Sequence, residues 1–234
     1  MASAELDLQL ATNWMSTISL FPLVILGLIG SFGNLIIFTS KELKNSSCAF
    51  YFRCTAFFEA FILSFGGISR LATEHFSSTV IEQNLIFCKI RAYLITSFTQ
   101  AAMYFLLMAA IDRCMTTSVR VQYRVFSQLK MAYRVVFLIV LLTFLMNIHV
   151  LIFYDIQGTC IPRPGTYALF YSIQLIIWSG IIPDGLIIFF TLWTWRNVKQ
   201  LRLRHIATTI PNRARDRAKQ RMENQLIIVS KNLI

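Results

Sequence analysis

The chain has 234 residues, of which 56% are hydrophobic and only 14% are charged, and its mean hydropathy is +0.60. Soluble domains carry about a quarter charged residues, so this composition excludes an ordinary soluble protein. The net charge of +11 reflects 22 Lys and Arg against 11 Asp and Glu. Because the basic residues follow one side of the apolar segments instead of forming a basic domain, we expect no nucleic-acid partner.

Apolar segments of about 20 residues, the length that a bilayer core requires of a helix, recur along the chain. They predict an all-α, polytopic membrane helix bundle with five transmembrane helices, at about 15–39, 48–72, 90–112, 131–154 and 167–193. Segments such as 19–38 and 135–153 lack the polar face that a helix around a soluble core would need.

The remaining segments complete the expected organisation. We expect an extracellular N-terminal tail at 1–14, the transmembrane bundle within 15–195, and a basic cytoplasmic loop at 196–225. Residues 226–234 turn apolar again and are too few to span a membrane, so they are expected to be the truncated start of a sixth helix.

Lys and Arg are distributed unevenly between the two sides of the predicted bundle. With the N-terminus outside, 18 lie on the cytoplasmic side and four on the outer side, at Arg70, Lys89, Arg91 and Arg163. This is the positive-inside bias of membrane proteins. No basic leader precedes the first span, which we therefore expect to be a retained anchor. A complete chain is expected in the plasma membrane, in contact with membrane lipid.

The first two predicted spans hold small or polar residues that need partners inside a bundle. In the first span, Gly30, Gly33 and Asn34 lie near the middle, and helix packing is sufficient to explain them. In the second, Glu59 lies deep in the membrane, where an ionisable group is costly and marks a candidate functional site. The alternative is a protonated Glu that is hydrogen-bonded within the bundle.

The third predicted span has a polar interior. Thr96, Ser97, Thr99 and Gln100 fall within five residues. Lipid does not favour so many polar side chains, so we expect this span to be central in the bundle. Thr99 and Gln100, with Glu59, form a candidate intramembrane polar site.

The last two predicted spans carry isolated polar residues. The fourth is nearly pure hydrocarbon apart from Asn147 and His149, and no second His or Cys stands at ligand spacing. We therefore expect neither a metal site nor a cofactor. In the fifth, Pro183 removes a backbone donor at mid-depth and should kink the helix. Asp184 follows it and must face the interior or water.

Five cysteines provide an independent test of the orientation. Cys48, Cys54 and Cys114 lie on or near the cytoplasmic side, where thiols stay reduced. Cys88 and Cys160 both lie on the outer side, so a disulfide between them is predicted. It would tie the start of the third span to the loop between the fourth and fifth. The alternative is that both are free thiols.

The stretch "MAAIDRCMTT" ends the third span with Asp112 and Arg113, 24 residues after Cys88. This is the spacing between the helix-3 Cys and the Asp/Glu-Arg-Tyr triplet of rhodopsin-like (class A) seven-transmembrane G-protein-coupled receptors. Further matches are Gly33, Asn34, Cys160 and Pro183. The chain resembles that family over about residues 15–234, as helices 1 to 5 and the start of helix 6, and is expected to be incomplete after helix 5.

The resemblance implies a function and a switch. A receptor of this family binds an extracellular ligand and signals through a heterotrimeric G protein at the cytoplasmic face. Its triplet Asp holds the adjacent Arg at rest, and activation frees the Arg to meet the G protein. Those roles would fall to Asp112 and Arg113. Ile95 stands where amine receptors carry an Asp, so a peptide ligand is favoured over an amine.

The chain departs from the family pattern at several positions. Cys114 replaces the usual Tyr after Arg113, Thr191 stands where helix 5 often has a Tyr, and the fourth span lacks the usual Trp. The family's helix-2 acid would fall near 61 or 62, so an ion-binding role is open for Glu59. The 234 residues are expected to lack counterparts of the family's helices 6 and 7.

Two other functions stay open. A transporter or channel subunit would explain Glu59 and Asp184 within the membrane, although the chain lacks paired half-helices and repeat symmetry. A non-signalling truncated receptor would instead associate with full-length partners. An enzyme is not expected, because the spans carry neither a metal-ligand cluster nor a credible Ser–His–Asp set.

Overall fold

The computed structural model describes residues 2–43, 45–70, 72, 84–118, 127–157 and 159–202, with only the backbone described for 2–20 and 159. The predicted cytoplasmic loop beyond Arg202 and the predicted helix start at 226–234 lie outside the described residues.

Within the described residues, five helices are long and apolar enough to cross a membrane, so the protein is a multi-pass membrane protein with a mainly helical fold, as predicted. They are Phe21–Thr39, Ser47–Arg70, Leu85–Thr116, Leu129–Phe153 and Thr166–Arg202. The third begins five residues before its predicted start and the fifth ends nine residues after its predicted end. Hydropathy detects only the apolar part of a helix. The helical hydrogen bonds continue beyond that part, so the helix ends lie outside the predicted bounds.

Several spans are built from more than one element. In chain order the elements are α1 (Ala2–Thr39), α2 (Ser47–Phe61), the π-helix η1 (Ile62–Gly67), α5 (Leu85–Thr116), α7 (Leu129–Met146), α8 (His149–Phe153), β1 (Tyr154–Gln157), β2 (Thr159–Pro162), α9 (Thr166–Gln174) and the π-helix η2 (Leu175–Ile181). Residues 182–202 then continue as an α-helix. Because α1 begins at Ala2, the predicted N-terminal tail continues the first span as helix.

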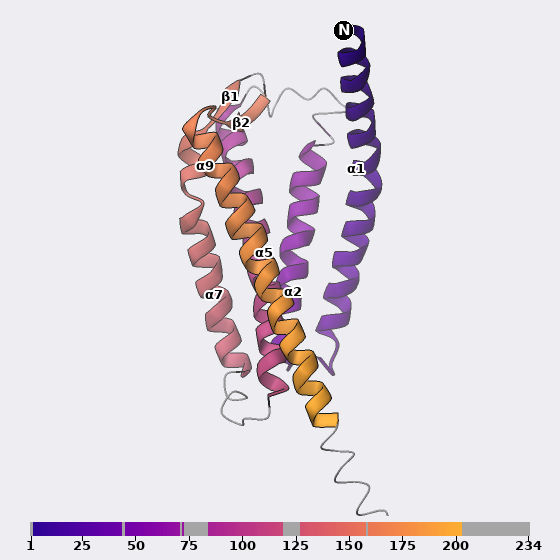
Figure 1. Ribbon diagram of the computed structural model, residues 1–234, viewed down its shortest axis with the longest axis vertical. Helices are drawn as coiled ribbons and strands as arrows, with labels where there is room; N and C mark the ends of the chain where they lie inside the picture. The colour runs from indigo at the N-terminus through magenta and orange to yellow at the C-terminus, as the bar shows by residue number, and fades with distance from the viewer. Residues whose placement is uncertain are drawn as a thin grey trace, which may run out of the picture.

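Helix α5 is the centre of the bundle, which confirms the expectation from its polar interior. It packs against α2, η1, α7, α8, η2 and the β-strands, whereas α1 packs mainly against α2 and η1 (Figure 1). Nearly half of the apolar window of α5 (44%) is buried, against 6% for the last span. The buried polar residues of α5 include Thr96, Ser97 and Gln100, so its polar side faces other helices.

A short antiparallel hairpin corrects the all-α prediction. Strands β1 and β2 pair with Tyr154 opposite Pro162 and lie at the end of the bundle that also holds the N-terminus (Figure 1). Four-residue strands are too short for their periodicity to stand out in a sequence. The predicted disulfide is confirmed: Cys88 at the start of α5 is bonded to Cys160 in β2.

Gly33, predicted as a helix-packing or signature residue, makes no close contact with a neighbouring span among the described residues. A Cβ at Gly30 or Gly33 would meet no atom within 4 Å, apart from the local helix backbone. The close approach between the first two spans occurs instead at Gly27 and Gly67, where a Cβ would lie 2.7 Å from a side chain of the neighbouring span. Which glycine faces the neighbour depends on the rotation of α1, and hydropathy carries no information on it.

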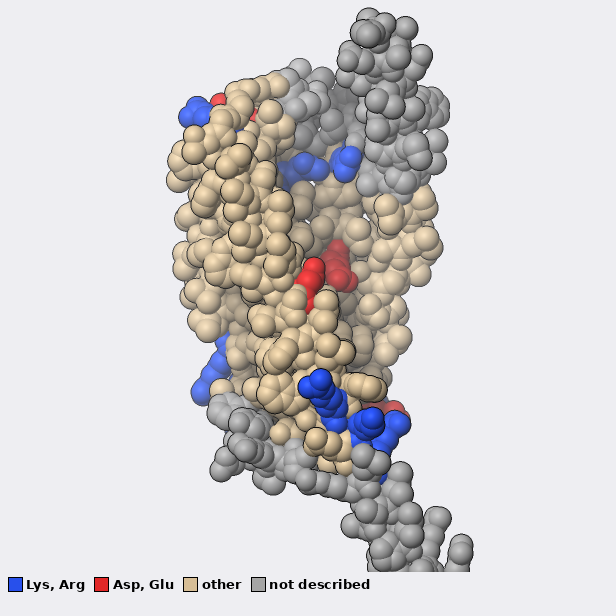
Figure 2. All heavy atoms as spheres, in the orientation of Figure 1, with Lys and Arg blue, Asp and Glu red and all other residues tan. Residues whose placement is uncertain are grey.

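Lys and Arg lie toward the ends of the face drawn in Figure 2, whereas acidic side chains lie both there and at mid-height. The acidic side chains at mid-height lie in a hollow between α1 and the last helix. Glu59 and Asp184 are the described acidic residues that lie midway along their spans. Asp184 is exposed and Glu59 is half-buried, so an open face of the bundle carries both.

Candidate functional sites

Asp112 is buried at the end of α5 that lies far from the disulfide, with 6% of its surface exposed. Its Oδ1 accepts hydrogen bonds from the hydroxyls of Ser47, at 2.7 Å, and Ser127. Ser47 is the first residue of α2, and Ser127 lies just before α7. A buried carboxylate needs such donors. Asp112 therefore connects the ends of three spans.

Arg113 is oriented away from that cluster. Its Nε donates to Cys48 Sγ at 2.9 Å, and within the described residues no ion pair joins it to Asp112. Adjacent side chains on an α-helix point about 100° apart, which separates the two charges. Arg113 also lines a cavity of about 370 Å³ together with Thr191 of the last span. Asp112 and Arg113, the pair predicted to act as a switch, are thus held by different partners.

Sequence analysis did not identify Ser47, Cys48 or Ser127 as partners of the charged pair. Ser is common before and at the start of helices, so its presence there does not distinguish a carboxylate ligand from a capping residue. Ser47 and Ser127 are 80 residues apart in the chain. Their meeting at Asp112 depends on tertiary packing alone.

The predicted polar site of Glu59, Thr99 and Gln100 is divided by the structure. Glu59 and Thr99 line one cavity of about 360 Å³, together with Ser31 and Asn34 of α1. No side chain among the described residues donates a hydrogen bond to the Glu59 carboxyl group. Gln100 follows Thr99 on α5, and adjacent side chains on an α-helix point about 100° apart. Gln100 therefore points to another side of the helix.

Gln100 belongs instead to a chain of buried amides between α5, α7 and α9. Asn147, which is fully buried, donates from Nδ2 to Gln100 Oε1 at 2.6 Å and to the Thr143 carbonyl at 2.8 Å. Gln174 Nε2 in turn donates to Asn147 Oδ1 at 3.4 Å. Interhelical amide bonds of this kind stabilise membrane bundles by about 1 kcal/mol each.

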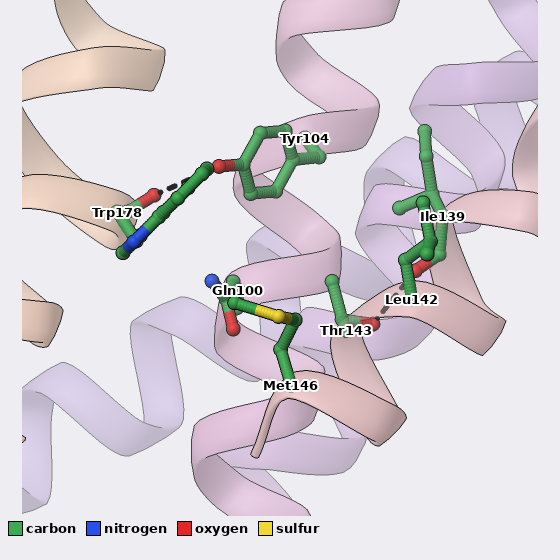
Figure 3. Close-up of a pocket in the computed structure, with 7 residues that line it drawn as sticks. All are labelled: Gln100, Tyr104, Ile139, Leu142, Thr143, Met146 and Trp178. Atoms are coloured by element: carbon green, nitrogen blue, oxygen red, sulfur yellow. Dashed lines mark hydrogen bonds between the residues drawn. The ribbon is translucent and has the colours of Figure 1, made fainter.

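Pro183 has a consequence one turn earlier in the same span. The N–H of Ile182 donates to the Ile177 carbonyl, in the i→i+5 pattern of the π-helix η2. The next carbonyl, that of Trp178, would need the N–H of residue 183, which proline lacks. The Tyr104 hydroxyl of α5 donates to that carbonyl instead, at 3.2 Å (Figure 3). A neighbouring helix thus satisfies the group that proline leaves free.

The hairpin closes the opposite end of the bundle over an aromatic cluster. Cys88, Val150, Tyr154 and Tyr171 form a buried core there, and the hydroxyls of Tyr171 and Thr96 are 2.9 Å apart. Burial raises the pKa of the Tyr154 hydroxyl. This end is therefore a packed cap tied to α5 by the disulfide, and the ion pair between Asp155 and Arg163 lies on its surface.

The geometry defines a class of protein, a five-span helical membrane protein whose central helix has a disulfide at one end and a charged pair at the other. No protein-family model matches the chain, and no curated protein does either. In the part of the chain that the structure describes, no group of three or more His, Cys, Asp or Glu could hold a metal ion.

Proposed function

We propose that the chain forms the first five helices of a G-protein-coupled receptor, which binds an extracellular ligand and signals through a heterotrimeric G protein. One observation carries the proposal: α5 has the disulfide to the hairpin at Cys88 and the charged pair at Asp112 and Arg113, 24 residues on. Such a helical segment is about 36 Å long, between the thickness of the bilayer core and that of the whole bilayer. The two features would then lie at opposite membrane surfaces.

The orientation follows from the same helix. Disulfides persist on the oxidising side of a membrane, which supports an outer position for the hairpin and the N-terminus and an inner position for the charged pair. The excess of Lys and Arg on the opposite side supports this orientation. A peptide ligand is favoured over an amine, because Ile95 offers no counter-ion.

The switch works through Asp112. Its carboxylate holds Ser47, at the start of α2, and Ser127, two residues before α7, against α5. We call the two hydrogen bonds to the Asp112 carboxylate the latch. Hydrogen bonds to a charged group contribute about 1.5–3 kcal/mol each. The latch is therefore strong enough to favour the resting state and weak enough for a bound ligand to reverse that preference. Arg113 already lies beside the cavity that borders the last span. Release of the latch would let α5 move and present Arg113 to the G protein.

Asp112→Asn tests the proposal. In a chain that carries all seven helices, we expect this substitution to raise basal signalling by about tenfold. Loss of the carboxylate's charge removes roughly 1.4 kcal/mol from the resting state, which corresponds to that factor. The measurement is ligand-free nucleotide exchange on the G protein in membranes, normalised to the amount of receptor.

Glu42→Gln is the matched control, because Glu42 is an exposed acidic residue in the turn between α1 and α2. It removes the same charge from the same side of the membrane without changing a residue that binds Asp112. We expect no rise in ligand-free nucleotide exchange. Unchanged exchange in Asp112→Asn, at normal receptor levels, would contradict the switch.

A second candidate is a transporter or channel subunit, which the cavity at Glu59 favours. An acidic side chain at mid-depth that lines an open cavity is typical of ion pathways. Ion flux through vesicles that contain the purified chain separates the two candidates, since a receptor carries none.

A further inference from the structure

Arg91 is a half-buried cation three residues after Cys88 on α5, which is about 4.5 Å further along the helix than the disulfide. Long basic side chains near the end of a span usually extend their charge to the membrane surface. The guanidinium of Arg91 is instead directed toward the second span. Its Nε donates to Ser69 Oγ, and its Nη2 donates to the Gly66 carbonyl at 3.3 Å. The charge of Arg91 therefore lies between α5 and the end of the second span.

Both partners of Arg91 are neutral groups. Among the residues whose side chains are described at this end of the bundle, Asp155 is the one acidic residue, and it pairs with Arg163 at 3.7 Å. No described carboxylate lies within ion-pair distance of Arg91. A partly buried charge usually has a charged partner, because removing it from water is costly.

Capping of the second span explains only part of this arrangement. Gly66 is among the last four residues of that span, and basic side chains often bind the last carbonyls of a helix. A helix C-terminus carries the equivalent of about half a negative charge, which leaves about half of the positive charge of Arg91. Arg70 follows Ser69 in the chain and repels Arg91 electrostatically, so it adds to the positive charge.

The donors of Arg91 that stay available have the geometry of an anion site. A guanidinium has five N–H donors, and the two hydrogen bonds to the second span use one on Nε and one on Nη2. Nη1 and the second N–H of Nη2 form the remaining edge. Two parallel N–H groups on such an edge match the two oxygens of a carboxylate. An ammonium group would be repelled there, and a neutral amide would leave the charge uncompensated.

This site is close to the outer opening of the proposed receptor. Arg91 lies about one helical turn from the disulfide that ties the hairpin to α5. Figure 2 shows basic side chains at the hairpin-side end of the hollow that holds the acidic side chains. A group that enters from the hairpin side would therefore meet positive charge first.

We propose that Arg91, with Arg70 beside it, binds a carboxylate of the extracellular ligand, and that this ligand is a peptide with a free C-terminal carboxylate. The inference rests on the proposed receptor function and names the chemical class of its ligand. A C-terminus can enter the bundle as a single extended chain, whereas an internal Asp or Glu would bring a bend of two chain segments. Capture of a terminal carboxylate is a recurring mode of peptide recognition.

Affinity selection of dipeptides on the full chain, held in phosphatidylcholine nanodiscs, tests the site. The probes are a mixture of N-acetylated dipeptides without acidic side chains, prepared once as free acids and once as amides. Mass spectrometry of the retained peptides gives the ratio of acid to amide for each sequence. We expect the acids to be retained at least about tenfold better, the factor for one hydrogen bond to a charged group.

Arg91→Gln should abolish this preference, because glutamine keeps hydrogen-bonding capacity and removes the charge. Lys89→Gln is the matched control. Lys89 is a cation on the same helix, two residues earlier and on another side, and its Nζ donates to the Ile152 carbonyl at 3.4 Å. We expect the preference to persist in this variant. Arg91→Lys, which keeps the charge without the paired donors, should show a smaller preference than the unchanged chain. The Cys88–Cys160 disulfide, measured in each variant, reports whether the bundle has folded.

Equal retention of acids and amides, or retention of neither, would overturn the proposal, as would an unchanged preference in both Arg91 variants. Displacement of the acids by an equal concentration of inorganic phosphate would indicate a general oxyanion site and would overturn the peptide assignment. The selection uses no G protein, so its outcome is independent of the nucleotide exchange measured for Asp112→Asn. Failure of the ligand class can thus be distinguished from failure of the proposed receptor function.

Discussion

At the residue scale, Gly67 is the position where the absence of a side chain matters most for packing. A Cβ there would lie 2.7 Å from Cγ2 of Val24 on α1. Val24 is buried and β-branched, so its side chain has little freedom to rotate away. Gly27 makes an equally close approach, but to the flexible end of Leu63. Close packing of the first two spans therefore depends chiefly on Gly67.

Gly67→Ala is expected to destabilise the protein by about 1–3 kcal/mol, because overpacking must push α1 from the second span. Gly33→Ala is expected to be neutral or to stabilise by up to about 1 kcal/mol, since it gains helix propensity and meets no atom. Thermal unfolding of both variants in detergent, followed by helical circular dichroism, makes the comparison. Equal effects would show that the two spans separate more easily than this contact implies.

At the scale of elements, the last span is adapted to its proline. The π-helix η2 ends two residues before Pro183, and Tyr104 of α5 supplies the donor that the Trp178 carbonyl lacks. Sequence analysis expected a kink at Pro183. The structure adds that the disturbance lies in the preceding turn and is stabilised by a side chain from another span.

A double-mutant cycle tests this link. We expect Tyr104→Phe to cost about 1–2 kcal/mol, because the Trp178 carbonyl loses its partner. In a Pro183→Ala background the same change should cost much less, since alanine restores a backbone N–H at 183. The measurement is again unfolding in detergent. An identical cost in both backgrounds would mean that the tyrosine acts by packing and not through the freed carbonyl.

At the scale of the whole molecule, the disulfide and the positive-inside bias predict the same orientation. The hairpin with Cys160 lies at the N-terminal end of the bundle, and the excess of Lys and Arg falls on the other side. Five spans require the N-terminus and the segment after Arg202 to lie on opposite sides of the membrane.

Epitope tags at the N-terminus and after Arg215 test that orientation. When the plasma membrane alone is permeabilised, we expect antibody to reach the tag after Arg215. For protein at the cell surface, the N-terminal tag should already be accessible on intact cells. For protein in internal membranes, the same tag should face the lumen and stay protected from antibody. The reason is that no Lys or Arg holds that segment in the cytoplasm. The reverse pattern would contradict the proposed receptor and the outer position of the disulfide.

The sequence by itself determined the five spans of the described residues and the helical fold class apart from one hairpin, and it predicted the pairing of Cys88 with Cys160. These follow from properties summed over consecutive residues, namely hydropathy, charge and the side of the membrane on which a loop lies. Such sums do not depend on how a helix is rotated about its axis, so they can be obtained from the sequence alone.

Only the tertiary structure decided which side chains meet. It joined Asp112 to Ser47 and Ser127, separated Gln100 from Thr99 and Glu59, and moved the close helix contact from Gly33 to Gly67. The neighbours that each of these residues meets depend on how the helices are rotated about their axes relative to one another, although adjacent residues such as Thr99 and Gln100 always point about 100° apart. A rotation of about 100° exchanges one residue for the next and leaves the hydropathy of the span unchanged, so packing between helices had to determine it.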